Sequence, residues 1–337
     1  MRNIVVNASL VIVVCLVMAV GLEVGASWYL TLPTVPEDHP FRHLIADPTL
    51  GWREEPSVTF TINEQWTVPE YPFDYPIEIN ALGWHDQETP LAKPAGVERL
   101  LLIGDSFVEC FQAPHELCAQ AWIERNTGMQ VIPAGVAGWG TDQELAFYQT
   151  EGASYTPDRV LLVLYIGNDI ANNWAPLDSN RGPWPNYILG KSTTPPALAL
   201  AHFIHYLMLP SPPTFASGFG VFAEPILPAW LPAFGETERL LRKFARSVAD
   251  DGIPFGVVII PSSYQLAAET LPKTAYPVDV LAPTAWLKGI FDQAGIDYLD
   301  LLPFLTRAEY IQDGGHLTAD GQRIMGQAIA AWIVSVN

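Results

Sequence analysis

The stretch RLLLIGDSFVEC, residues 99–110, decides the fold of this chain. Its four consecutive apolar residues, Leu100 to Ile103, predict a central parallel strand that is covered on both faces. Gly104 permits a tight turn into a following helix. Ser106 then lies at the start of that helix, where free backbone N–H groups can stabilise negative charge beside its oxygen. The stretch therefore predicts a buried strand that leads directly into a nucleophile.

Further apolar runs follow this strand and are separated by amphipathic segments typical of helices. The runs are Gln130 to Ile132, Val160 to Ile166, Phe255 to Ile260 and Ile296 to Leu299, and the helical segments include Asp142 to Ser154, Glu236 to Asp251, Val280 to Ala294 and Ala319 to Val334. This alternation predicts an α/β domain in which a parallel sheet lies between two layers of helices. Ligands bind such sheets at the carboxyl ends of the strands.

Four groups of residues that could take part in catalysis lie at these strand ends or just before the last helix. They are Gly104-Asp105-Ser106, the loop Ala134 to Gly140, Gly167-Asn168-Asp169 and Asp313-Gly314-Gly315-His316. A serine hydroxyl becomes a good nucleophile when a base takes its proton, and His316 is the candidate base. Asp313 can orient the imidazole of that base. The backbone N–H groups of Ser106 and Gly138 and the side-chain amide of Asn168 can bind an oxyanion.

In this order, the motifs GDSFVEC, the Gly138 loop, GNDI and DGGH resemble blocks I, II, III and V of the SGNH/GDSL hydrolase superfamily, over roughly residues 98–335. The resemblance implies the triad Ser106, Asp313 and His316, and an oxyanion hole of Ser106, Gly138 and Asn168. It also implies a flavodoxin-like three-layer α/β/α fold with a five-stranded parallel sheet. Two positions depart from the family pattern, because Cys110 stands where Gly is frequent and Pro133 where Asn is frequent.

These residues predict a serine esterase that hydrolyses small acyl esters, notably O-acetyl groups on envelope or exported glycans, through an acyl-enzyme. One alternative is an O-acyltransferase that uses the same triad with a sugar hydroxyl in place of water. Another is a catalytically silent protein that binds glycans or takes part in their assembly. We expect no cofactor, and no metal, since no third ligand accompanies His202 and His205. The formal charge of −19 argues against nucleic acid as a partner.

The N-terminal segment indicates where in the cell the protein works. Residues 4–22 are apolar except for Asn7 and Ser9, a length that can just span a bilayer as a helix. With Arg2 before it, this segment predicts a membrane anchor with the catalytic domain outside the cytoplasm, periplasmic or at the cell surface. The alternative is a signal peptide cleaved near Val24-Gly25-Ala26, which would give a secreted protein.

The chain divides into three parts in this interpretation. Residues 1–26 form the anchor or signal segment, residues 27–97 a loop- and strand-rich module, and residues 98–337 the hydrolase domain with an insertion at about 170–235. Strands are expected at Val58 to Ile62 and Ile77 to Ile79, a turn at Asn80 to Trp84, and a helix at Leu198 to Leu209. Aromatic residues of the module either line a glycan site or fasten the module to the main domain; they are Trp52, Trp66, Tyr71, Phe73, Tyr75 and Trp84.

Two further features of the chain, the tryptophans of the insertion and a pair of cysteines, each allow two interpretations. The tryptophans Trp174, Trp184 and Trp230 of the insertion could wall a substrate cleft or an acceptor site. Cys110 and Cys118 lie eight residues apart and form either a disulfide bond, as an exported chain permits, or two buried thiols.

Overall fold

The computed structural model describes residues 2–31, 43–47, 49–61, 75–173, 215–311 and 315–336. Its centre is a sheet of five parallel strands in the order β6-β5-β7-β8-β9. The strands are β5 (Arg99–Gly104), β6 (Gln130–Gly135), β7 (Arg159–Tyr165), β8 (Phe255–Ile260) and β9 (Asp297–Asp300). This is the order of flavodoxin-like folds, with a topological switch point where β5 lies between β6 and β7. The predicted five-stranded parallel sheet is confirmed.

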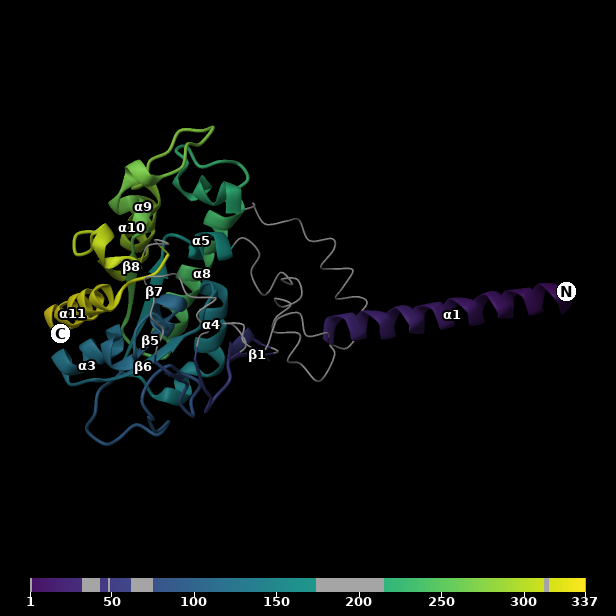
Figure 1. Cartoon of the computed structure of the whole chain (residues 1–337), viewed down its shortest axis with the longest axis horizontal. Coiled ribbons are helices and arrows are strands. Elements are labelled where there is room, and N and C mark those ends of the chain that lie inside the picture. The colour runs from purple at the N-terminus through teal and green to yellow at the C-terminus, as the bar shows by residue number, and fades with distance from the viewer. Residues whose placement is uncertain are drawn as a thin grey trace.

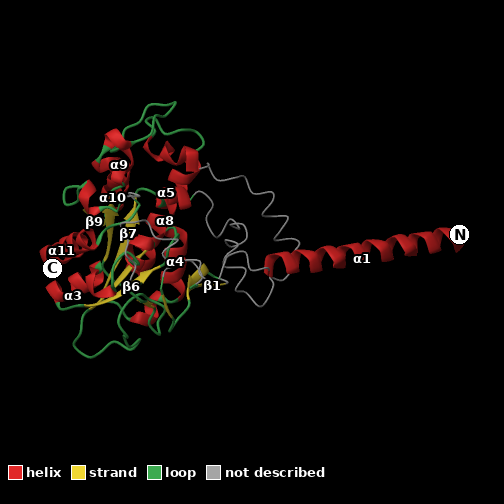
Figure 2. Ribbon diagram, in the orientation of Figure 1, coloured by secondary structure: helices red, strands yellow, loops and turns green. Residues whose placement is uncertain are grey.

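Helices cover both faces of the sheet, as Figure 2 shows. On one face, Leu101 and Ile103 of β5 share a core with α4 (Thr141–Thr150), α8 (Leu231–Asp250) and α10 (Ala282–Ala294). On the other, Leu100 and Leu102 pack with α3 (Ala119–Thr127) and α11 (Ala319–Ser335). Successive side chains of a strand point to opposite faces, so the apolar run of β5 supplies both cores.

Short helices complete the domain. They are α2 (Ser106–Glu109), α5 (Asp169–Asn172) and α9 (Ser263–Leu266), with 3-10 turns at His115–Leu117, Gly152–Tyr155, Phe215–Phe222, Ala268–Thr270 and Arg307–Glu309. The four helices predicted in the α/β domain outside the insertion are found, although α8 begins five residues before the expected start, with Pro232 in its first turn. Helix α3 was not among the predicted helices.

The N-terminal helix α1 (Arg2–Thr31) extends away from the α/β domain in Figure 1. Among the residues that the structure describes, no helix is both long and apolar enough to cross a membrane. The membrane helix expected at residues 4–22 is therefore not supported.

Two small antiparallel hairpins precede the sheet in sequence. One joins β1 (Leu44–Asp47) to β2 (Gly51–Glu54), and the other joins β3 (Thr59–Phe60) to β4 (Ile77–Glu78). The β3 and β4 strands lie within the predicted segments but are shorter, and the β1–β2 hairpin was not predicted. Leu44, Leu50 and Trp52 of this first hairpin belong to the same core as α4 and α8.

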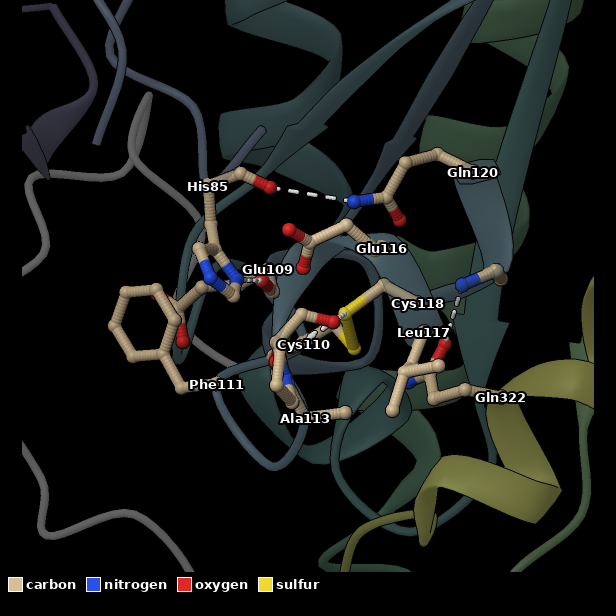
Figure 3. The surroundings of a disulfide bond; sticks show 12 residues. His85, Glu109, Cys110, Phe111, Ala113, Glu116, Leu117, Cys118, Gln120 and Gln322 are labelled. Atoms are coloured by element: carbon tan, nitrogen blue, oxygen red, sulfur yellow. Dashed lines mark hydrogen bonds between the residues drawn. A yellow bond between two sulfur atoms is a disulfide. The ribbon is translucent and has the colours of Figure 1, made fainter. Parts of the chain in front are cut away.

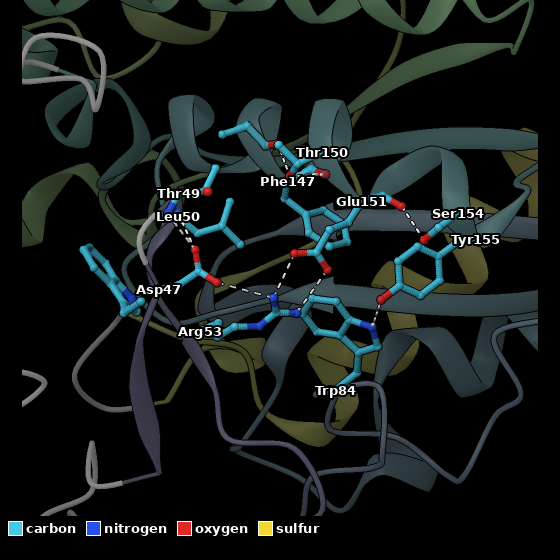
Figure 4. A network of polar contacts seen from close by, with 12 residues as sticks. Asp47, Thr49, Leu50, Arg53, Trp84, Phe147, Thr150, Glu151, Ser154 and Tyr155 are labelled. Carbon is cyan, nitrogen blue, oxygen red and sulfur yellow. Dashed lines mark hydrogen bonds and ion pairs between the residues drawn. The ribbon is translucent and has the colours of Figure 1, made fainter. Parts of the chain in front are cut away.

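An ion-pair network fastens the first hairpin to the end of α4 (Figure 4). The guanidinium of Arg53 donates hydrogen bonds of 2.8 and 3.2 Å to the two carboxylate oxygens of Glu151, and lies 3.5 Å from a carboxylate oxygen of Asp47. Beside it, the indole N–H of Trp84 donates to the Tyr155 hydroxyl at 3.2 Å. A guanidinium that donates to both oxygens of a carboxylate fixes the relative orientation of the two side chains as well as their contact. The hairpin is thus oriented against the helix that follows the Gly138 loop.

Buried tryptophans fill the core rather than a surface site. Trp52, Trp84 and Trp230 are at most 9 % exposed, which favours the packing role over the glycan-binding role for the first two and removes Trp230 from the walls of an open cleft. The hydroxyl of Tyr75 donates to the Phe111 carbonyl at 2.9 Å. The other predicted features of these segments lie outside the described residues: Trp66, Tyr71, Phe73, Trp174, Trp184, His202, His205 and the helix at Leu198 to Leu209.

Candidate active site

Ser106 is the first residue of α2, directly after β5 and at the carboxyl edge of the sheet. Asp105 caps this helix, since its carboxylate accepts the Phe107 N–H at 3.0 Å. The backbone N–H of Ser106 lies in the first turn, where helix donors have no partner within the helix. The sequence folds this way because an apolar strand ends at Gly104, where an added Cβ would lie 2.6 Å from a methyl group of Val108.

His316 meets Ser106 across 210 residues of sequence. Its Nε2 lies 3.0 Å from the Ser106 Oγ, a distance that suits a hydrogen bond from the hydroxyl to an imidazole whose proton is on Nδ1. The imidazole stacks on Phe107, with ring centroids 5.7 Å apart. A backbone bridge between Tyr310 and Leu317 holds the segment just before α11. Serine and histidine are therefore placed for proton transfer, while Asp313 lies outside the described residues.

Asn168 follows β7 and occupies the N-cap position of α5. Its side-chain N–H donates to the Asp105 carboxylate at 2.9 Å, so the residues on either side of the switch point are joined next to the nucleophile. An amide nitrogen carries two hydrogens, and this bond uses one of them. The sequence analysis did not predict Asp105 as the partner of Asn168, because the contact depends on β5 and β7 being neighbours in the sheet.

The Gly138 loop follows β6 on the same edge. Gly138 has a φ of +77°, a conformation that glycine adopts without steric cost. The Asn172 side chain of α5 contacts the Gly138 and Trp139 carbonyls at 3.5 and 3.4 Å. The three predicted oxyanion donors thus come from three adjacent strand ends: Ser106 after β5, Gly138 after β6 and Asn168 after β7.

Buried carboxyl groups surround this edge of the sheet. Asp105, Glu144 and Asp169 are fully buried, and burial raises the pKa of each. The charges of neighbouring carboxyl groups raise the pKa of Glu144 and Asp169 further. No group of three or more His, Cys, Asp or Glu in the described residues has the arrangement of a metal site. Sequence reasoning missed Glu144, which looks like an ordinary helix residue.

A disulfide bond joins Cys110 and Cys118, with their Cα atoms 6.1 Å apart (Figure 3). Cys110 ends α2 in the left-handed conformation, with a φ of +59°. Glycine adopts this conformation most readily, which explains the frequency of Gly here in the family that the motifs resemble. Pro133 is also accommodated, because β6 is an edge strand, where a residue without an N–H is tolerated.

Comparison with known proteins finds similarity at the level of solved structures. The chain resembles GDSL-type lipolytic proteins. A GDSL-like lipase from Bacteroides thetaiotaomicron is 12 % identical with a TM-score of 0.42, and covers 73 % of this chain and 93 % of its own. A lipase/acylhydrolase from Enterococcus faecalis is 14 % identical with a TM-score of 0.42 (71 % and 97 % covered). The esterase EstA from a Pseudoalteromonas species is 11 % identical with a TM-score of 0.43 (71 % and 98 %).

No model of a known protein family matches the chain, and no curated protein does. The structural similarities are low in both identity and TM-score. The assignment of a reaction therefore depends on the geometry of the site.

Proposed function

We propose that this chain is a serine esterase of the SGNH/GDSL type that hydrolyses small acyl esters through an acyl-enzyme. The observation that carries the proposal is the 3.0 Å approach of His316 Nε2 to Ser106 Oγ at the carboxyl edge of a flavodoxin-like sheet. The oxyanion donors proposed from the motifs follow three neighbouring strands of the sheet, β5, β6 and β7. By the same resemblance, Asp313 is the group that orients the His316 imidazole.

Acylation begins when the Ser106 hydroxyl attacks the carbonyl carbon of the ester and its proton passes to His316 Nε2. The carbonyl oxygen becomes an oxyanion, bound by the N–H groups of Ser106 and Gly138 and by the second amide hydrogen of Asn168. The intermediate then collapses, the bond to the leaving oxygen breaks, and His316 returns the proton to that oxygen. The alcohol leaves and the acyl group stays on Ser106.

Deacylation repeats these steps with water. His316 takes a proton from water, the resulting hydroxide attacks the acyl carbon, and the Ser106 oxygen leaves with the proton that His316 holds. The products are a free carboxylic acid and the regenerated serine. O-Acetyl esters of envelope or exported glycans are the proposed substrates, and water is the proposed acceptor.

The test uses the full chain with activated esters of increasing acyl length and with acetylated polysaccharides. Ser106→Ala and His316→Ala should each abolish hydrolysis, and the double variant should lose little more, because the two residues act as a unit. Asp313→Asn should keep partial activity. A Ser106→Ala variant with a native circular dichroism spectrum and wild-type turnover would contradict the proposal.

A second measurement separates hydrolysis from transfer. The enzyme receives an activated acetyl ester with and without a candidate glycan, and mass spectrometry follows the acetyl group. We expect release as free acetate even when glycan saturates the enzyme. Acetyl groups that appear on the glycan in stoichiometric amount would instead identify an acyltransferase.

We also propose that the catalytic domain works outside the cytoplasm. The Cys110–Cys118 disulfide supports this, because such bonds persist in oxidising compartments. Alkylation of protein denatured without reductant, taken directly from fractionated cells, should label neither cysteine.

A further inference from the structure

The peptide group between Ala137 and Gly138 is the starting point. In a trans peptide the C=O of one residue and the N–H of the next lie in one plane and point in opposite directions. Whatever holds the Ala137 carbonyl therefore sets the direction of the Gly138 N–H, the proposed oxyanion donor. The structure shows a specific partner for that carbonyl.

The partner is Trp52 of the β1–β2 hairpin. Its indole N–H donates to the Ala137 carbonyl at 3.0 Å. A Cβ added to Gly138 would lie 3.5 Å from Cζ2 of the same indole, so the ring also packs against Gly138. A second hydrogen bond runs the other way, since the indole N–H of Trp139 donates to the Trp52 carbonyl at 2.9 Å. The hairpin is thus bonded to the residue before Gly138 and to the residue after it.

Glu109 holds the preceding peptide group, the one between Val136 and Ala137. This residue is 3 % exposed, at the end of α2, and its carboxyl oxygen accepts the Ala137 N–H at 2.7 Å. Glu54 of β2 lies 2.5 Å from Nδ1 of His43, and its charge acts on the Glu109 carboxyl group. Burial, followed by the charge of Glu54, raises the pKa of Glu109 well above its usual value.

Both peptide groups of Ala137 are therefore held by side chains, the first by Glu109 and the second by Trp52. Because hydrogen bonds in a chain polarise one another, the bond to the Ala137 carbonyl also makes the Gly138 N–H a better donor.

We propose that Trp52 and Glu109 are positioning residues that aim the Gly138 N–H at the oxyanion, and that the N-terminal hairpin is in this way part of the esterase site. This proposal rests on the proposed function. The chain therefore needs its first hairpin for catalysis and not only for stability.

The main test is Trp52→Phe, which keeps an aromatic ring in the core and removes the indole N–H. The matched control is Trp122→Phe, because the Trp122 indole also donates to a backbone carbonyl, that of Leu117 at 3.3 Å, on the far side of the sheet from the hairpin. Loss of a whole oxyanion donor costs about 10²- to 10³-fold in kcat, so a misdirected donor should cost about 10- to 50-fold. We expect this loss in kcat for Trp52→Phe with KM nearly unchanged, and neither change for Trp122→Phe.

Glu109 gives a second, independent pair of variants. Glu109→Gln keeps a side-chain oxygen that can accept the Ala137 N–H, and it is uncharged, as a protonated carboxyl group is. We expect it to keep kcat within about threefold of wild type at neutral pH. Glu109→Met fills similar space without the hydrogen bond to the Ala137 N–H and should lose about 10- to 100-fold in kcat.

Amide hydrogen exchange of the full chain supplies a readout that needs no catalysis. Exchange in the peptide that covers residues 134–140 should be faster in Trp52→Phe and Glu109→Met, and unchanged in Glu109→Gln and Trp122→Phe. A Trp52→Phe variant with wild-type kcat, or with unchanged exchange in this peptide, would overturn the proposal, as would a Glu109→Gln variant as slow as Glu109→Met. If the wild-type chain hydrolyses no ester, the proposed function fails, and exchange alone then decides whether these residues hold the loop.

Discussion

Removal of the Cys110–Cys118 disulfide should destabilise the chain by an amount that the structure allows us to calculate. The bond closes a loop between residues eight apart, which corresponds to about 2.5 kcal/mol of stabilisation through the lower entropy of the unfolded chain. The replacement at Cys110 also matters, because this residue has a φ of +59°. The cysteine already carries about 1 kcal/mol of backbone strain in that conformation; alanine keeps this strain, whereas glycine removes it.

Two double variants separate these contributions. Cys110→Ala with Cys118→Ala should lose about 2.5 kcal/mol of unfolding free energy, because the loop-closure term is lost and the strain is unchanged. Cys110→Gly with Cys118→Ala should lose only about 1.5 kcal/mol, because glycine relieves the strain. Both are made in a Cys15→Ala background, which removes the exposed free thiol of the described residues.

The assay is urea unfolding followed by tryptophan fluorescence, with and without reductant. Reductant should lower the unfolding free energy of the Cys15→Ala protein and leave both double variants unchanged. An alanine double variant that loses less than about 1 kcal/mol would refute the loop-closure argument. An alanine double variant as stable as the glycine one would refute the argument from backbone strain.

Two other predictions concern His85 and the close contact of Gly135 with α2. Burial lowers the pKa of His85 to about 4, and its Nδ1 lies 3.0 Å from the Glu109 carbonyl. Because the folded state disfavours the charged ring, the contribution of His85 to stability should be constant above pH 6.5 and fall as the pH drops toward 4. Urea unfolding at pH 7 and 4.5 should show that His85→Asn, whose amide can donate the same bond, loses about 2 to 3 kcal/mol less than wild type over this range; equal losses would contradict the assignment. A Cβ on Gly135 would lie 2.6 Å from the Glu109 backbone nitrogen, so Gly135→Ala should cost about 2 to 3 kcal/mol by thermal or urea unfolding, whereas the control Gly289→Ala, with open space around its added Cβ within α10, should stabilise by about 0.5 to 1 kcal/mol. A neutral Gly135→Ala would show that β6 and α2 can separate at no cost.

The strands of the sheet and the segments that carry the motifs could be predicted from sequence alone. A short apolar run such as Leu100 to Ile103 fits a buried strand by its length, because Gly104 ends the run and a helical segment follows. These signals are local, and the predicted strands lie within one residue of the observed ones at each end, except that β6 extends three residues beyond the predicted end at Ile132. Parallel pairing then places their carboxyl ends together, which is why Ser106, Gly138 and Asn168 could be grouped before any coordinates were known.

The β1–β2 hairpin and the partners of the site residues could not be predicted in this way. The hairpin is four residues long on each side, too short for a periodic signal. Asn168 bonds Asp105 only because β7 lies beside β5, and nothing in either segment specifies that order. Cys110 and Cys118 were left as a bridge or two thiols, because the turn between them decides whether the sulfurs meet.

Sequence by itself determined the α/β architecture, the parallel sheet and the identity of the candidate nucleophile, because local hydrophobic period and turn chemistry specify elements and the residues at their ends. Only the tertiary structure decided which of those ends meet. The approach of His316 to Ser106 spans 210 residues, and the bond from Trp52 to Ala137 spans 85. Contacts of this kind depend on strand order and on the packing of whole layers, and these are properties of the assembled chain that no local pattern contains.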